Sequence, residues 1–257
     1  MEWYIYPLVI AAGFAAGFIN TVAGSGSLIT LPLLIMLGLP ANVANGTNRV
    51  AILLQNVVGV RRFHTQKVLD FKRGLLLAIP AAIGAVIGAQ IAAGLDEQLL
   101  RRTIGVLMVI MLIILIIRPK RWLEGTHGAI GEKPTVLQYL IFFAIGIYGG
   151  FIQIGVGLFL LAGLVLSAGY NLVWGNAVKL LIVLCFTIFA LIVFVINDQV
   201  NWFIGLILAI GNMTGAWFAT KVAVKRGAEF VRWFLIGVVI VSAILLLGGE
   251  DWLKKLL

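Results

Sequence analysis

The chain has 257 residues, of which 62% are hydrophobic and 11% charged, and its mean hydropathy is +1.11. This composition excludes an ordinary soluble domain, and a single cysteine, Cys185, excludes an internal disulfide. The net charge of +9 does not indicate a nucleic-acid partner, because the basic residues fall mostly between long apolar runs, as in the cytoplasmic loops of membrane proteins.

Ten apolar segments follow one another along the chain. They fall near residues 3–23, 27–39, 41–61, 73–95, 99–117, 135–155, 156–169, 171–197, 201–221 and 229–248. Most of them approach or exceed the ~20 residues that a helix needs to cross a bilayer. The second and seventh segments, of roughly 13 residues, are too short to span unaided and are expected to be half-helices or re-entrant pieces.

The two halves of the chain carry the same pattern of four long segments and one short one. The charged stretch 118–134 forms a linker between a first repeat, 1–117, and a second, 135–257. The glycine pairs Gly84/Gly88 and Gly211/Gly215 recur in corresponding segments, with a spacing typical of closely packed membrane helices. We therefore predict an all-α polytopic membrane protein built from two repeats of about five helical segments, eight long and two short or re-entrant.

The loop charges predict an orientation. The loop 61–73 is rich in Lys and Arg and is expected to be cytoplasmic, whereas the loops around Asp96 and Asp198 should lie outside. Each half then crosses the membrane an odd number of times, so the repeats have inverted topology. The prediction is a multi-pass protein of the cytoplasmic (inner) membrane with both termini outside.

Each half also contains a Gly-x-Gly break inside an apolar run. Gly24 and Gly26 correspond to Gly155 and Gly157 at a spacing of 131 residues. A helix broken in hydrocarbon is tolerated only where protein or a water-filled cavity surrounds the break. Paired breaks in repeated halves are typical of a transporter's binding site.

Two cations lie deep in the apolar segments that follow the breaks. Arg49 and Lys179 are 130 residues apart, and the apolar segments contain no carboxylate to neutralise them. A buried cation costs at least ~2.5–3.5 kcal/mol. Either the two cations bind helix-end carbonyls or they neutralise a bound anion, and we favour the anion.

The predicted substrate-binding residues are the polar and glycine residues of the breaks and of the segments that carry the cations. They are Arg49, Lys179, Asn20, Thr21, Gly24, Ser25, Gly26, Ser27, Thr47, Asn48, Gln153, Gly155, Gly157 and Asn176. No catalytic residue, cofactor or metal site is expected, because the Gly-Ser-Gly around Ser25 lacks the spacing of a nucleophile elbow and both histidines fall beside charged loop residues.

The stretch Gly17-Phe-Ile-Asn-Thr-Val-Ala-Gly-Ser-Gly-Ser27, with Leu31-Pro32-Leu33, Ala44–Asn48 and the second-half stretch 149–157, resembles the TauE/SafE sulfite-exporter-like family. The resemblance covers about residues 7–248. It implies export of sulfite, sulfoacetate or other small sulfur-containing anions. The second break carries Gln153 where the first has Val22, so the two half-sites need not bind equivalently.

These observations predict a secondary transporter or facilitator that exports a small anion, foremost sulfite or an organosulfonate, by alternating access around the paired breaks. The expected partners are the small anionic solute and membrane lipid, and a homo-oligomer is left open. Two alternatives remain: a non-transporting membrane scaffold or assembly factor, and a small-anion channel.

Overall fold

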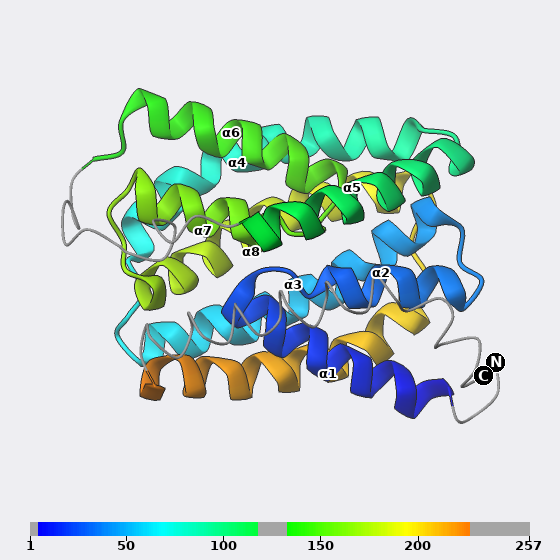
Figure 1. Cartoon of the computed structure of the whole chain (residues 1–257), viewed down its shortest axis with the longest axis horizontal. Helices are drawn as coiled ribbons and strands as arrows, with labels where there is room; N and C mark the ends of the chain where they lie inside the picture. The colour runs from blue at the N-terminus through cyan, green and yellow to red at the C-terminus, as the bar shows by residue number, and fades with distance from the viewer. Residues whose placement is uncertain (1–4, 118–132, 227–257) are drawn as a thin grey trace.

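The computed structural model describes residues 5–117 and 133–226, and these form helices without strands (Figure 1). The helices are α1 (Ile5–Ala23), α2 (Ser27–Met36), α3 (Ala41–Thr65), α4 (Phe71–Gly94), α5 (Glu97–Ile117), α6 (Val136–Phe151), α7 (Val156–Leu166), α8 (Leu172–Ile196) and a further helix, Trp202–Arg226. Four of them, α1, α4, α8 and Trp202–Arg226, are long and apolar enough to cross a membrane. The predicted all-α membrane fold is therefore confirmed for these residues, whereas the predicted segment 229–248 and nearly all of the linker lie outside them.

Short polar residues mark the starts of several long helices. Asp70 accepts a hydrogen bond from the backbone N–H of Arg73 at the start of α4, and Asn171 accepts two from the first turn of α8. Thr135 and Gln138 form a capping box at the start of α6. Such caps satisfy N–H groups that have no partner inside the helix, so the loop residues fix where each helix begins.

The two short helices fold back beside the helices that precede them. Figure 1 shows α2 returning toward the end at which α1 begins, and α7 returning toward the end at which α6 begins. They contain 10 and 11 residues, and at 1.5 Å per residue each covers only about half of a ~30 Å hydrocarbon layer. The turns between the paired helices use glycines with positive φ, +78° at Gly24 and +67° at Gly155.

The helix bounds recur between the halves. The starts of α3 and α8, at residues 41 and 172, are 131 residues apart, and so are the starts of α4 and the helix Trp202–Arg226, at 71 and 202. Both α3 and α8 contain 25 residues. In Figure 1, α1 and α6 begin at opposite ends of the molecule.

The helices pack as two bodies, and each body contains one long helix from the other half of the chain, α4 in one and Trp202–Arg226 in the other. In one body, α4 packs on α6 so closely that a Cβ on Gly88 would lie 2.6 Å from the backbone nitrogen of Phe151. In the other, the helix Trp202–Arg226 packs on α1, and a Cβ on Gly215 would lie 2.8 Å from the nitrogen of Phe18. The first body contains α4, α6, α7 and α8, and the second contains α1, α2, α3, α5 and Trp202–Arg226. Each centres on a hydrophobic core, and each core also takes in residues of the other body: Ile52 of α3 in the first, and Ile152 and Ile154 after α6 in the second. Glycines thus let the backbones approach where lipid offers no hydrophobic driving force.

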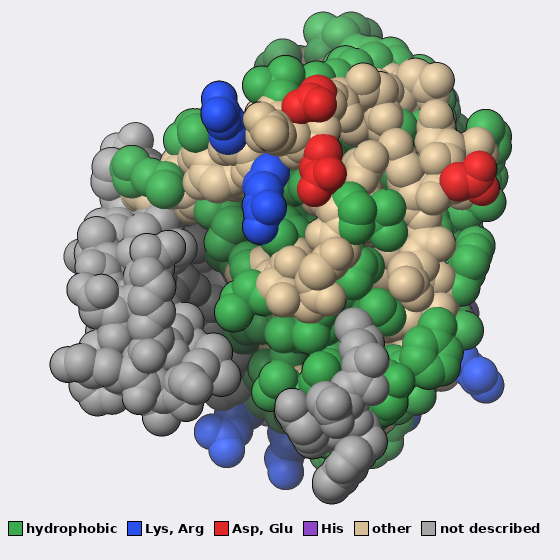
Figure 2. All heavy atoms as spheres, turned by 90° about the vertical axis from the view of Figure 1, so that its right-hand side faces the viewer, with side chains coloured by type: hydrophobic (Ala, Val, Ile, Leu, Met, Phe, Trp, Pro, Cys, Tyr) green, Lys and Arg blue, Asp and Glu red, His purple; other side chains and the backbone are tan. Residues whose placement is uncertain are grey.

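The two ends of the molecule differ in charge. One end, which we call the acidic end, holds the loops after α2, α4 and α8, and its carboxylates include Asp96 and Asp198. Figure 2 views this end and shows acidic side chains on it, with Lys or Arg side chains beside them and apolar surface on the flanks. The opposite, basic end holds the loops after α3 and α7, with Lys67 in the first of these loops and Lys72 in the first turn of α4.

A polar cluster joins the two loops at the basic end. The hydroxyl of Tyr170 donates to Asp70 Oδ2 at 2.7 Å, and Arg73 Nη1 donates to the carbonyl oxygen of Ala168 at 3.3 Å. Burial, with the hydrogen bond to Asp70, raises the pKa of the Tyr170 phenol above its ordinary value. The cluster holds the start of α4 against the connection that leads into α8.

Candidate site at the helix breaks

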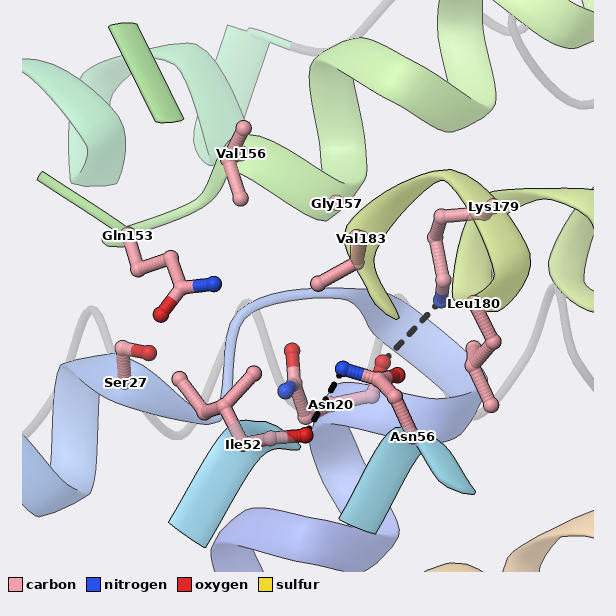
Figure 3. A pocket seen from close by; sticks show the side chains of 10 residues that line it. All are labelled: Asn20, Ser27, Ile52, Asn56, Gln153, Val156, Gly157, Lys179, Leu180 and Val183. Carbon is pink, nitrogen blue, oxygen red and sulfur yellow. Dashed lines mark hydrogen bonds between the residues drawn. The ribbon is translucent and has the colours of Figure 1, made fainter. Parts of the chain in front are cut away.

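A small cavity lies where the two helix breaks meet, between the two bodies (Figure 3). Its volume is about 10 Å³, which is space for roughly one water molecule. Both halves of the chain contribute to its lining, which consists of Asn20, Ser27, Ile52, Asn56, Gln153, Val156, Gly157, Lys179, Leu180 and Val183. None of these lining residues is acidic.

The two breaks touch each other through their backbones. The N–H of Gly157 donates to the carbonyl oxygen of Gly24 at 3.1 Å. A Cβ on Gly24 would lie 2.5 Å from the carbonyl carbon of Gly157, and a Cβ on Gly157 would collide with Gly24 in the same way. The glycines are therefore needed for close approach, and Gly24 also for its positive φ.

The first turns of both short helices face this crossing. Ser27 begins α2, Val156 begins α7, and both residues line the cavity. Their N-cap residues, Gly26 and Gly155, provide no side-chain cap. A helix N-terminus carries partial positive charge and exposed N–H groups, so two of them at one cavity favour an anion.

Lys179 lies on α8 and ends at the cavity, with 1% of its surface exposed. Its Nζ donates to the carbonyl oxygen of Asn20 at 3.0 Å (Figure 3). It also donates to the carbonyl oxygen of Thr21 at 3.0 Å and to Asn176 Oδ1 at 2.7 Å. The two carbonyls belong to the last turn of α1. Lys179 therefore neutralises the negative end of a helix from the other half of the chain.

Arg49 lies on α3 and is completely buried. Its Nη1 donates to the carbonyl oxygen of Gly149 at 3.1 Å, its Nη2 donates to that of Gly150, and its guanidinium stacks 4.8 Å from the ring centre of Phe194. These carbonyls belong to the last turn of α6. Arg49 thus neutralises the negative end of α6, as Lys179 neutralises that of α1.

Two roles were expected for Arg49 and Lys179: binding of helix-end carbonyls, or neutralisation of a bound anion. Both cations donate hydrogen bonds to helix-end carbonyls, as the first role requires, and Lys179 also donates to Asn176 Oδ1. Lys179 also lines the cavity, whereas Arg49 does not. That the two cations neutralise a bound anion stays a prediction, and of the two only Lys179 reaches the cavity.

Two hydrogen-bonded groups support the cavity from the α1–α3 side. Ser27 Oγ accepts from Asn48 Nδ2 at 3.2 Å, and Asn48 Oδ1 accepts from the hydroxyl of Thr30 at 2.7 Å. Separately, Gln55 Oε1 accepts from the amides of Asn20 and Asn212, at 3.2 and 3.3 Å. Both groups lie largely buried, so they fix the amide orientations in the absence of competing water.

A single amide faces the cavity from the second break. Gln153 is 3% exposed, and its Nε2 donates to the hydroxyl oxygen of Thr187 on α8 at 2.8 Å. Its Oε1 is buried and has no hydrogen-bond partner among the described residues. Figure 3 shows the carboxamide turned into the cavity with its oxygen toward Ser27.

Of the predicted site residues, five line the cavity: Asn20, Ser27, Gln153, Gly157 and Lys179. Others support it: Gly24 crosses Gly157, Thr21 and Asn176 accept from Lys179, and Asn48 bonds to Ser27. Ser25 and Gly26 lie in the first break, between α1 and α2, but do not line the cavity.

Three of the predicted site residues make their contacts away from the cavity. Arg49 binds the end of α6, Thr47 Oγ1 accepts from the backbone N–H of Asn201 at 2.8 Å, and a Cβ on Gly155 would meet Met111. Sequence reasoning did not name Thr187 and Asn212 as site residues, although each is a polar residue inside an apolar segment and could have been found by that signal.

Metal chemistry has no support in this part of the chain. No group of three or more His, Cys, Asp or Glu side chains comes together among the described residues. The cavity instead offers N–H and O–H donors, amides and one ammonium group. This set suits binding of a small polar anion.

Comparisons with known proteins agree with a transport role. The sulfite exporter TauE/SafE family matches residues 9–246. The probable membrane transporter protein ORF9 of Sinorhizobium is 27% identical over 248 residues, covering 96% of this chain and 94% of that protein. The probable membrane transporter protein YfcA of Escherichia coli K12 is 26% identical over 246 residues, covering 94% and 89%. No solved structure matches this chain.

Proposed function

The chain belongs to the sulfite exporter TauE/SafE family, and we propose that it is a secondary transporter or facilitator that exports a small anion, foremost sulfite or an organosulfonate, across the cytoplasmic membrane. The names of its relatives support membrane transport in general. The anion and the direction are the proposal.

One observation carries the choice of an anion. The cavity lies between the N-termini of two half-helices and beside the ammonium group of Lys179, and its described lining contains no acidic side chain. The two helix N-termini and the ammonium group are positive, and Lys179 neutralises the negative end of α1 beside them. A cation would find no acidic side chain among these lining residues.

Export is favourable without a coupling ion. The membrane potential is negative inside, and moving one elementary charge through 100 mV changes the free energy by about 2.3 kcal/mol. An anion leaving the cell gains this energy. Because the buried part of the described chain offers no carboxylate for proton exchange, a uniport driven by the potential is the simplest mechanism.

Alternating access would use the two bodies described above. The cavity of about 10 Å³ is too small for an oxyanion, so the bodies must separate on one side to admit substrate. We propose that the two halves are inverted-topology repeats, supported by the recurring helix bounds and by α1 and α6 beginning at opposite ends (Figure 1). In such repeats the same rocking motion opens first one side and then the other.

We further propose that the basic end is cytoplasmic and that the N-terminus lies outside. The support is the excess of lysine and arginine in the loops of that end. The flanks of α4 expose large apolar side chains such as Ile79, Ile83 and Ile87, which suit contact with lipid.

The proposal is tested with the full-length purified protein. A thermal-shift screen against sulfite, sulfonates, sulfate, carboxylates and phosphate identifies stabilising anions, and flux of each into liposomes is then measured. We expect stabilisation and flux for sulfite or a sulfonate, and neither for choline as the cation control. Absence of binding and flux for every anion would support a scaffold and contradict transport, whereas rates far above those of transporters would indicate a channel.

A matched pair of variants tests the site. Lys179→Met should lose the anion-dependent thermal shift, whereas Lys67→Met, at the basic end and away from the cavity, should keep it. If folded Lys179→Met protein binds and transports as well as the wild type, the assignment of this cavity is wrong.

A further inference from the structure

Gln153 presents a hydrogen-bond acceptor to the cavity, although the helix N-termini and the ammonium group of Lys179 favour an anion there. Its Oε1 is buried without a partner among the described residues, while its Nε2 is held by Thr187. An anion that offers only acceptor oxygens would leave this carbonyl unsatisfied and would repel it. The molecule that occupies the cavity is therefore expected to donate a hydrogen bond to this carbonyl.

The first break contributes a donor group to the same cavity. The oxygen of Ser27 already accepts from Asn48, whose own oxygen accepts from Thr30. This chain of donors leaves the hydroxyl hydrogen of Ser27 directed away from Asn48. Figure 3 shows the carboxamide oxygen of Gln153 turned toward Ser27, so the two breaks offer an acceptor from the second half and a donor from the first.

We propose that the site selects anions that also carry a hydrogen-bond donor, such as a protonated oxyanion or a hydroxyalkyl sulfonate, and that Gln153 is the residue that makes this selection. The inference rests on the proposed anion transport and narrows its substrate class. The anionic oxygens would lie at Ser27 and the helix N-termini, within the field of the Lys179 charge, and the donor would bind Gln153 Oε1. Thr187 is a positioning residue, since it holds the amide nitrogen and thereby turns the oxygen to the cavity.

Only the second half of the chain carries this acceptor. The position that corresponds to Gln153 in the first break is Val22, which is completely buried and belongs to the core that joins the two bodies. The acceptor at the second break gives a donor-bearing anion a direction in the cavity. Its donor must lie toward the α6–α7 break.

Two sulfonates of the same chain length, with and without a hydroxyl, provide the test. The affinities of the full-length protein for 2-hydroxyethanesulfonate and ethanesulfonate are measured by thermal shift, and their flux is measured in liposomes. An unsatisfied buried acceptor corresponds to roughly 5- to 150-fold in affinity, so the hydroxylated anion should bind tighter by a ratio in this range. Gln153→Met, which removes the acceptor, should bring that ratio to about one.

Control variants separate this role from a structural one. Gln199 also has a bonded Nε2 and an unpartnered Oε1 but lies outside the cavity, so Gln199→Met should keep the wild-type ratio. Thr187→Val should lower the ratio, and Thr187→Ser, which keeps the hydroxyl, should restore it. These comparisons do not depend on overall stability, because each ratio is measured within one variant.

Every outcome decides the matter. Equal affinities in the wild type, or an unchanged ratio in Gln153→Met, overturn the inference, because the acceptor would then be satisfied without the substrate. If sulfite binds but neither sulfonate does, the transport proposal stands and the selection by Gln153 fails. If no anion binds at all, the transport proposal itself fails.

Discussion

Replacing Gly24 by alanine tests whether the crossing of the two breaks holds the molecule together. Gly24 has a φ of +78°, which costs an L-residue about 1–2 kcal/mol. Its new Cβ would also lie 2.5 Å from the carbonyl carbon of Gly157, and overpacking of this kind costs about 1–3 kcal/mol. Together the two effects predict a loss of about 2–5 kcal/mol in the free energy of unfolding.

Gly38→Ala is the matched control. Gly38 also has a positive φ, +89°, but no atom lies within 4 Å of the position that a Cβ would take there. It should therefore lose only the backbone contribution of about 1–2 kcal/mol. The difference between the two variants isolates the contact between the breaks, at about 1–3 kcal/mol.

The assay is thermal unfolding of purified protein in detergent, followed by tryptophan fluorescence. At about 2–4 °C per kcal/mol, Gly24→Ala should unfold roughly 2–12 °C below Gly38→Ala. Gly157→Ala, which has the contact but no positive φ, should also be destabilised, whereas Gly105→Ala, with open space around it, should not. Equal melting temperatures for Gly24→Ala and Gly38→Ala would refute the close backbone crossing.

Three further predictions concern the polar contacts. Arg49→Lys should lower stability by about 1.5–3 kcal/mol in chemical or thermal unfolding, because one of two charge-assisted hydrogen bonds to the end of α6 is lost; an unchanged stability would contradict helix-end binding. Lys179→Met should lower stability by a similar amount or more even without anion, since three hydrogen bonds are lost, and a loss seen only with anion present would argue against the contact with α1. The pKa of Tyr170 is raised in the folded state, so its contribution to stability is present below about pH 10 and is lost as the pH rises further; Tyr170→Phe should unfold with a weaker pH dependence above pH 10, and an identical alkaline profile would count against this.

The helix breaks could be predicted because they carry their own local signal. Polar and glycine residues interrupt apolar runs at Gly24 and Gly155, and α2 begins at Ser27 as expected. The end of α6 was less predictable. It stops at Phe151, four residues before the predicted end, and Ile152–Ile154 continue outside the helix, because an apolar run has the same composition in either conformation.

The partners of the buried cations could not be predicted. The position of Arg49 and Lys179 in corresponding segments was visible, but their partners are backbone carbonyls 100 and 158 residues away along the chain. A carbonyl group is the same at every residue and leaves no mark in the sequence. The same limit applies to Gln153 and Thr187, which become a pair only when α8 packs against the second break.

The exchange of helices between the two bodies bears on the order in which the protein is made. α1 leaves the ribosome first, yet the helix on which its glycines pack begins only at residue 202, and the lysine that neutralises its end is residue 179. During synthesis the first hairpin must therefore wait in the bilayer with an unsatisfied end until most of the chain has followed. Neither half can complete its own packing alone, so a polypeptide cut in the linker should mature only when both pieces are produced together.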